Sequence, residues 1–179
     1  PIPTLEDLKN PLDEVIEPRA TQEEMTNFIE TELTESLKGL PTRTTQFGRF
    51  DKGLAYTILM KYYMHEKNWA KAEECGRELL KAEYGYGLMD RYADIFTLEN
   101  EGNKEIIFAC TEERGTNLQL WHDHALPGNY PTKNASIQKW DGYKVPWPFY
   151  RTFEEGDDRL SVLVGEYVGT DGVLFNEES

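Results

Sequence analysis

The sequence predicts a mainly α-helical fold with a minor β component, in which a helical hairpin scaffold carries long aromatic-rich loops and a short β-hairpin. Apolar residues recur at helical spacing through the first half of the chain, between residues 20 and 82. Residues 115–150 then show no period and are rich in aromatic residues, proline, glycine and asparagine. Near the end, Asp171-Gly172 separates two apolar runs and is a dipeptide typical of tight β-hairpins.

The composition narrows the classes of protein to which the chain can belong. Its 179 residues are 39% hydrophobic, enough for one substantial core or for one lobe of a larger protein. The formal net charge of -14 at pH 7 would repel a polyanion, so we expect no nucleic-acid partner. No stretch of sequence is apolar for long enough to span a bilayer. Cys75 and Cys110 stand among apolar neighbours and are expected to be buried thiols.

The first helix is predicted to follow an extended lead-in, residues 1–19, which contain several prolines and no sustained period. Thr21 and Glu24 have the spacing of a capping box, in which each side chain accepts a hydrogen bond from the other residue's backbone N–H. Pro41 ends the helix. Between these points one helical stripe is apolar and comprises Met25, Phe28, Ile29, Leu33, Leu37 and Leu40.

Two further helices, at about 51–66 and 69–82, are predicted to form an antiparallel hairpin because only Lys67 and Asn68 separate them. The side chains expected to face inward are Leu54, Ala55, Ile58, Leu59, Tyr62 and Tyr63 in one helix, and Trp69, Ala72, Cys75, Leu79 and Leu80 in the other. The large and small positions follow tetratricopeptide-like spacing, carried by Leu59, Tyr63, Trp69 and Ala72. The match ends at Gly76, where such a repeat usually has a bulky aromatic residue.

After Phe96 the pattern changes. The apolar run from Ile106 to Cys110 follows a turn-forming Asn-Glu-Gly-Asn cluster and predicts a short buried strand. The long stretch at 115–150 is typical of functional loops, and its aromatic content argues against disorder. The segment 159–175 predicts two strands joined around Asp171-Gly172.

Several segments, taken in order, resemble a known family. They are Pro18-Arg19 before the first helix, the helical hairpin, the aromatic segment of Tyr86, Leu88, Tyr92 and Phe96, the Asn-x-Glu-Ile-Ile-Phe pattern at 103–108, and the pattern of Phe153, Asp157 and Arg159. Over residues 18–160 their order and spacing resemble the SusD/RagB family of outer-membrane nutrient-binding lipoproteins from Bacteroidota.

This resemblance implies a scaffold with several tetratricopeptide-like units, decorated by loops and short strands. Family members are considerably longer than this chain. We therefore expect residues 1–179 to be a central segment of a SusD-like domain, with 1–19 as lead-in, 20–96 as helical scaffold and 97–179 as strands and ligand-side loops. The motifs themselves specify the fold and do not mark a ligand.

The resemblance also carries functional expectations. It implies a cell-surface protein of the outer membrane, lipid-anchored through residues that precede this segment in a longer parent chain. Such a protein is a non-catalytic lid on a SusC-like TonB-dependent transporter. Its expected ligand is an oligosaccharide or polysaccharide, less usually a peptide, and no cofactor is expected.

The irregular stretch supplies the candidate ligand-binding residues. Flat, rigid aromatic rings match the C–H face of a sugar, and nearby amide and carboxylate groups can bond to hydroxyls. The candidates are Trp121, His122, Tyr130, Trp140, Tyr143 and Trp147. The alternative is that these rings pack the long loop onto the helices, and the prolines beside Trp147 favour that alternative there.

Two clusters of ionisable residues permit other chemistry. The sequence His122-Asp123-His124 contains metal-ligating residue types, but it places no further ligand for a closed site, so no metal is expected. The carboxylates at 154–158 are of the type that glycoside hydrolases use, although neighbours in one loop rarely face each other across a sugar. A local salt-bridged turn at Asp157-x-Arg159 is the favoured interpretation.

Two alternative functions therefore remain open from the sequence. The helical hairpin alone would suit a tetratricopeptide-type protein–protein adaptor, which predicts further repeats and an open concave surface. The acidic loop alone would suit a glycoside hydrolase.

Overall fold

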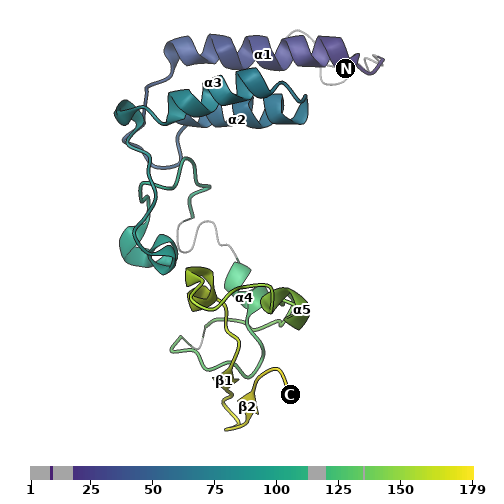
Figure 1. Ribbon diagram of the computed structural model, residues 1–179, viewed down its shortest axis with the longest axis vertical. Coiled ribbons are helices and arrows are strands. Elements are labelled where there is room, and N and C mark those ends of the chain that lie inside the picture. The colour runs from purple at the N-terminus through teal and green to yellow at the C-terminus, as the bar shows by residue number, and fades with distance from the viewer. Residues whose placement is uncertain (1–8, 10–17, 113–119, 135) are drawn as a thin grey trace. The chain divides into compact units, whose positions relative to one another are not determined.

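The computed structural model describes residues 9, 18–112, 120–134 and 136–179. The chain divides into two compact units, Pro1–Gly87 and Leu88–Ser179, each described here by itself. The first unit holds three α-helices, and the second holds short helical segments and a small β-sheet (Figure 1). Among the described residues, no helix combines the length and the apolar character that crossing a membrane requires.

Helix α1, Gln22–Gly39, begins where the sequence predicts. The Thr21 hydroxyl accepts a hydrogen bond from the Glu24 N–H, at 3.2 Å, and the Glu24 carboxylate accepts one from the Thr21 N–H, at 2.8 Å. The bonds that the Thr21 N–H and the Thr21 hydroxyl donate to the Glu24 carboxylate hold the pKa of Glu24 below its ordinary value, since they favour the charged carboxylate. The capping box is confirmed.

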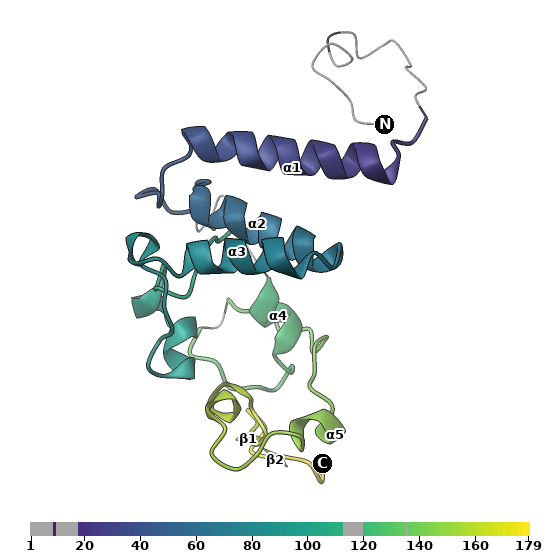
Figure 2. The same cartoon turned by 45° about the horizontal axis from the view of Figure 1, so that its top comes forward.

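Helices α2, Lys52–His65, and α3, Trp69–Leu79, form the predicted hairpin and lie side by side, with α1 along them (Figure 2). Lys67 takes a positive φ of 57° in the connection, and Asn68 caps α3 by accepting from the Lys71 N–H. Helix α1 is tied to both, because the Tyr62 hydroxyl donates to Thr26 and Lys71 pairs with Glu30 at 3.0 Å. The buried core consists of Leu59, Tyr63, Ala72 and Cys75, against which Leu33 and Leu37 pack.

Three of the residues predicted to face inward are exposed. Trp69 is 62% exposed because it is the first residue of α3, where no preceding turn covers it. Leu80 is 83% exposed because α3 ends at Leu79 rather than continuing to residue 82. Ile58 lies beside the narrow stripe of Ala55, Leu59 and Tyr63 that contacts the core, and it is exposed.

The aromatic segment after α3 closes the end of the hairpin. Tyr84, in the 3₁₀ helix η1 (Ala82–Tyr84), is only 1% exposed and stacks on Tyr86 at 6.1 Å between ring centroids. The guanidinium of Arg43 donates to the Tyr84 carbonyl at 2.9 Å and lies over the Tyr86 ring. Gly53, in the first turn of α2, gives Tyr86 its room, since a Cβ atom there would overlap the phenol oxygen.

In the second unit, side chains rather than strands fix the Asn-x-Glu-Ile-Ile-Phe segment. It follows the 3₁₀ helices η2 (Tyr92–Phe96) and η3 (Leu98–Asn100). The Asn103 amide donates to the Ile95 carbonyl, and the Glu105 carboxylate accepts from the Met89 N–H at 2.5 Å. The predicted strand at 106–110 is wrong, because these residues have an irregular backbone. The prediction that Cys110 is buried is also wrong, whereas Cys75 is buried and both are free thiols.

The Phe-x-x-x-Asp-x-Arg motif forms one compact cluster. Arg159 donates to both Asp157 carboxylate oxygens and lies over the Phe153 ring, 4.9 Å from its centroid. The salt-bridged turn is therefore confirmed. It starts the 3₁₀ helix η4, Asp158–Val162, so the expected strand does not begin at Arg159.

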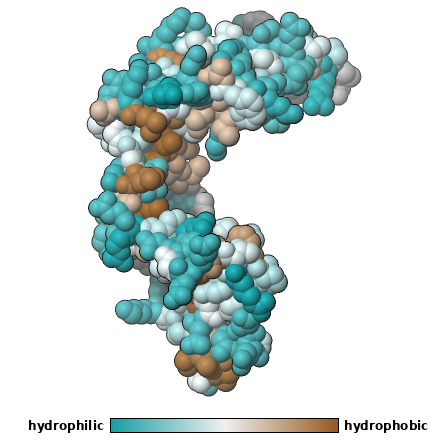
Figure 3. Space-filling view, viewed as in Figure 1, coloured by the Kyte–Doolittle hydropathy of each residue, from teal (hydrophilic) through white to brown (hydrophobic). Residues whose placement is uncertain are grey.

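The predicted β-hairpin is confirmed in a short form. Strands β1, Tyr167–Val168, and β2, Leu174–Phe175, pair antiparallel, with Tyr167 opposite Phe175. Gly172 takes a φ of 79°, the left-handed conformation that the turn requires. The outer face of the hairpin is apolar (Figure 3) and exposes Val168, Val173 and Leu174.

Candidate functional site

Two short helices interrupt the long aromatic stretch and position its side chains. Helix α4, Trp121–Ala125, contains the His-x-His pair. The chain returns alongside α4, where the Trp140 N–H donates to the Asp123 carbonyl at 2.6 Å and the Tyr143 N–H donates to the His124 carbonyl at 2.9 Å. Helix α5, Trp147–Tyr150, follows Pro146 and has a proline in its first turn.

These backbone bonds bring one group of aromatic rings together at α4. Trp121 stacks on Tyr143 with ring centroids 4.9 Å apart and planes 19° apart. His124 lies edge-on to Trp140, at 4.7 Å, and contacts Tyr143 at 5.3 Å. Trp121 and Tyr143 nevertheless remain 61% and 52% exposed, so their contact with each other leaves aromatic surface open to solvent.

A second aromatic group joins the loop to the β-hairpin. Tyr130 packs against Tyr167, with ring centroids 5.0 Å apart, and Tyr167 stacks on Phe175 at 5.3 Å. The Tyr167 hydroxyl donates to the Asn129 side-chain oxygen at 2.9 Å. Sequence analysis did not select Tyr167 or Phe175. The Asp171-Gly172 turn signals that the two strands meet, but a two-residue turn there would set Val168 opposite Phe175, whereas the structure pairs Tyr167 with Phe175.

A cavity of about 700 Å³ lies between these groups. It brings together Tyr130, Tyr143 and Trp147, three of the six predicted site residues, which come from separate parts of the loop. Apolar side chains and a few polar groups complete its wall, among them Leu126, Val145, Leu163, Asn129, Lys144 and Asp141. Lys144 and Asp141 form an ion pair at 3.0 Å, which neutralises much of their charge. The mixture of rings with few polar groups is typical of small-molecule pockets.

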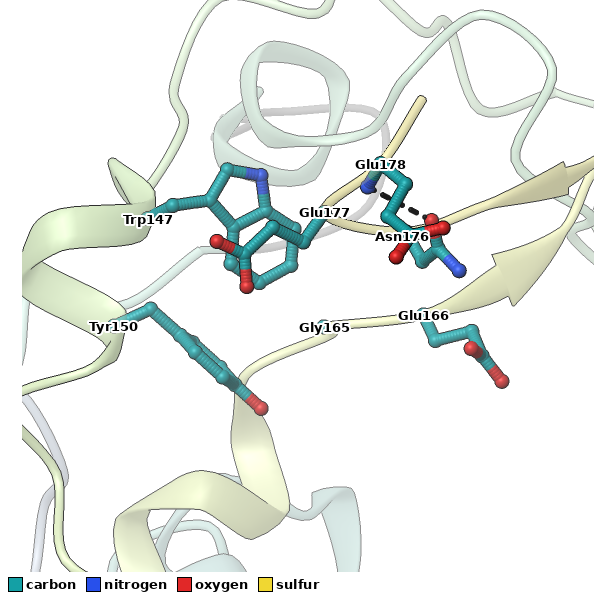
Figure 4. Close-up of a pocket in the computed structure, with 7 residues that line it drawn as sticks. All are labelled: Trp147, Tyr150, Gly165, Glu166, Asn176, Glu177 and Glu178. Atoms are coloured by element: carbon teal, nitrogen blue, oxygen red, sulfur yellow. Dashed lines mark hydrogen bonds between the residues drawn. The ribbon is translucent and has the colours of Figure 1, made fainter.

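A second cavity, of about 580 Å³ and widely open to solvent, adjoins the first beside α5 (Figure 4). Trp147 and Tyr150 form one side, with ring centroids 5.2 Å apart and planes nearly perpendicular. The other side comes from the chain around the β-hairpin and includes Glu166, Asn176 and Glu178. An ion pair between Arg151 and Glu177 ties the end of α5 to the segment after β2.

The remaining predicted site residues have different surroundings. Trp121 and Trp140 belong to the ring group at α4 and do not line either cavity. The side chain of His122 lies outside what the structure describes. Contact of any of the six residues with a ligand therefore stays a prediction. Tyr150 and Gly165, which line both cavities, were not among the predicted site residues.

The structure also describes the surroundings of the two clusters of ionisable residues, at 122–124 and at 154–158. Across the described part of the chain, no three His, Cys, Asp or Glu side chains gather as a metal site would need. In the acidic loop, the Arg159 guanidinium holds the pKa of Asp157 at about 2, through side-chain hydrogen bonds and the Arg159 backbone N–H. A carboxyl group with that pKa is ionised at neutral pH and cannot donate a proton to a leaving group.

Comparison with solved structures identifies the fold. No protein-family model matches the chain, and no curated protein matches it. The structure is similar to the crystal structure of a SusD-like protein from Bacteroides fragilis NCTC 9343, with a TM-score of 0.65 and 23% sequence identity. The similarity covers 88% of this chain but only 30% of that protein. The chain therefore has the fold of part of a SusD-like protein, as its ordered motifs predicted.

Proposed function

We propose that this chain is the saccharide-binding part of a SusD-type surface protein, and that it captures an oligosaccharide or polysaccharide without cleaving it. The observation that carries the proposal is the 700 Å³ cavity in which Tyr130, Tyr143 and Trp147 converge. The SusD-like fold supports it.

The walls of the cavity suit a sugar. Pyranose rings present C–H faces that pack on flat aromatic surfaces, and rigid aromatic side chains lose little entropy when they bind. Asn129 and Asn176 supply amide groups within the same wall, where they can donate to and accept from hydroxyls. These polar groups are few, which is how such sites combine affinity with orientation.

In the acidic loop, Asp157 is not suited to be the proton donor of a glycoside hydrolase. Glycoside hydrolysis needs a carboxylic acid that protonates the leaving oxygen and a second carboxylate on the other side of the sugar. Asp157 is held as a carboxylate by Arg159 and forms part of a packed turn with Phe153. It is therefore suited to fixing the chain before η4.

The cellular setting follows from the same resemblance. We place the parent protein at the outer face of the outer membrane, where it would be lipid-anchored and act with a SusC-like TonB-dependent transporter. In that arrangement the role of this segment is to hold the saccharide before it is transported. A peptide as cargo is the alternative within the same type of complex.

The test is native affinity electrophoresis of the full chain through gels that contain one polysaccharide each. Amylopectin, xyloglucan, galactomannan and hydroxyethyl cellulose form the panel, with bovine serum albumin as the non-binding control. We expect at least one polysaccharide to slow the chain, and substitution of Tyr143→Ala together with Trp147→Ala to restore its mobility. If none of the polysaccharides slowed the chain, the proposal of saccharide binding would fail and a peptide cargo would be tested next.

A further inference from the structure

The two cavities share a wall, and this wall is the basis of an inference that rests on the proposed function. Both are lined by Trp147, Tyr150, Gly165 and Asn176. The Tyr150 side chain runs from α5 toward the backbone at Gly165 (Figure 4). Each cavity alone falls within the range of about 300–1,000 Å³ that ligand pockets occupy.

Gly165 is needed for the position of Tyr150. A Cβ atom at residue 165 would lie 2.7 Å from the Tyr150 phenol oxygen and 3.0 Å from the carbon that bears it. The backbone at Gly165 does not have the positive φ of Gly156 or Gly172, so its conformation alone does not call for glycine. The close approach of the phenol is what requires the missing side chain.

Tyr150 has support on its other side as well. Its ring packs edge-on against Trp147, which is part of both cavities. The phenol is thus held between an indole and a glycine backbone, and a shift at either support would move it. Since side chains in packed walls move in discrete steps, a forced shift would push the ring into one of the two hollows.

We propose that Tyr150, placed by Gly165, divides one continuous aromatic cleft into two compartments and so determines the length of saccharide that the chain holds. A short saccharide fills one compartment. A longer one passes along the Tyr150 ring and gains the second compartment with its acidic and amide rim. Gly165 acts only through Tyr150 and is a positioning residue.

The experiment compares maltose with maltohexaose, cellobiose with cellohexaose, and mannobiose with mannohexaose by isothermal titration calorimetry on the full chain. For the series that binds, we expect the hexasaccharide to bind about tenfold more tightly than the disaccharide. In Gly165→Ala the displaced phenol should remove most of this length preference, while the affinity for the disaccharide changes less. Circular dichroism and thermal unfolding check that the variant remains folded.

Two further variants make the result specific. Gly39→Ala is the matched control, because Gly39 lies at the end of α1, lines neither cavity, and has no atom within 4 Å of its Cβ position. This control should keep the length preference. Tyr150→Ala should lose it, and adding Gly165→Ala to Tyr150→Ala should change nothing more, because the atom that clashes is gone.

Every outcome bears on the inference. A length preference that survives in folded Gly165→Ala, or in Tyr150→Ala if Gly165→Ala does not fold, overturns it and leaves saccharide binding intact. Equal affinity of the unsubstituted chain for short and long saccharides overturns it as well, and so do equal losses for both in the variants. Absence of binding by every saccharide, here and in the gel panel, overturns the proposed function and this inference with it.

Discussion

At the residue scale, two tyrosines close together in sequence differ in whether their hydroxyl groups form a hydrogen bond. Tyr84 and Tyr86 stack on each other at the end of the helical hairpin. The Tyr84 hydroxyl donates to Glu78 at 3.2 Å, whereas the Tyr86 hydroxyl is buried with no hydrogen-bond partner among the described residues. Burial is the main cause that raises the pKa of both phenols.

This difference predicts opposite responses to the same substitution. Tyr86→Phe removes a hydroxyl that has lost its water and gained no partner, so the free energy of unfolding should stay the same or rise by about 1 kcal/mol. Tyr84→Phe removes a hydrogen bond to a carboxylate and should lower it by about 1 kcal/mol. Urea unfolding of the two variants measures both values. An equal loss in the two would show that the Tyr86 hydroxyl does find a partner.

The Asp157–Arg159 pair predicts a pH dependence. The pKa of Asp157 is lowered from an ordinary 3.8 to about 2, so the folded state favours the carboxylate more than the unfolded state does. The pair's contribution to stability is therefore present above pH 3.8 and is lost as the pH falls through about 2. Arg159→Gln should bring the Asp157 pKa back toward 3.8, which a carboxyl-detected NMR titration measures. An unchanged pKa in this variant would mean that Arg159 is not its cause.

At the element scale, the start of α2 depends on one buried carboxylate. Asp51 is 3% exposed, and its two oxygens accept from the Leu54 N–H at 3.0 Å and from the Thr44 N–H at 3.2 Å. It therefore caps the helix and also fixes the linker that precedes it.

Asp51→Ala should lower the free energy of unfolding by about 2 kcal/mol, because the cap is lost and the partly buried Thr44 N–H loses its acceptor. Asn68→Ala is the matched control, since it removes the cap of α3 from an exposed position and should have a smaller effect. Chemical denaturation compares the two. An equal loss would show that the bond to Thr44 contributes nothing.

The sequence correctly predicted the elements that depend only on residues close together in the chain. The capping box of α1, the Lys67-Asn68 turn and the Gly172 turn each need only residues within a few positions of one another. The strand at 106–110 was wrong because a strand needs a partner that hydrophobicity alone does not supply. Trp69 was expected inside because its spacing matched a repeat, but the first residue of a helix is buried only when another element covers it.

The residues of the candidate site also separate into those that the sequence predicted and those that it did not. The concentration of aromatic residues between 121 and 150 was visible in the sequence, and three of the six selected residues line one cavity. Tyr167, Phe175 and Gly165 were not selected because the β-hairpin lies far away in sequence. Their role depends on the hairpin folding back on the loop, as the bond between Tyr167 and Asn129 shows.

At the scale of the whole molecule, charge predicts which polysaccharides are accepted. A formal net charge of -14 repels polyanions over roughly a Debye length, about 10 Å at 0.1 M salt. Neutral polysaccharides should therefore slow the chain more than polygalacturonate or alginate does in affinity gels at low salt. Adding salt should narrow this difference. Stronger retardation by an anionic polysaccharide would contradict the expectation and indicate a local basic site.

The division into two compact units predicts where binding resides. Trp69 and Trp147 provide a matched pair: Trp69 is largely exposed on α3 of the helical unit, whereas Trp147 lines both cavities of the second unit. An exposed indole can also stack on a sugar, so exposure alone would favour Trp69. A recessed site is favoured instead because several neighbouring groups contact the ligand at once and hold the ring in place.

Trp147→Ala should therefore weaken saccharide binding by more than about fivefold, while Trp69→Ala leaves it within about twofold. Affinity electrophoresis with the polysaccharide that slows the unsubstituted chain measures both. Circular dichroism controls for the loss of packing between Trp147 and Tyr150. The reverse order would place the ligand on the helical unit, and the aromatic cavities would then be packing features of the loop.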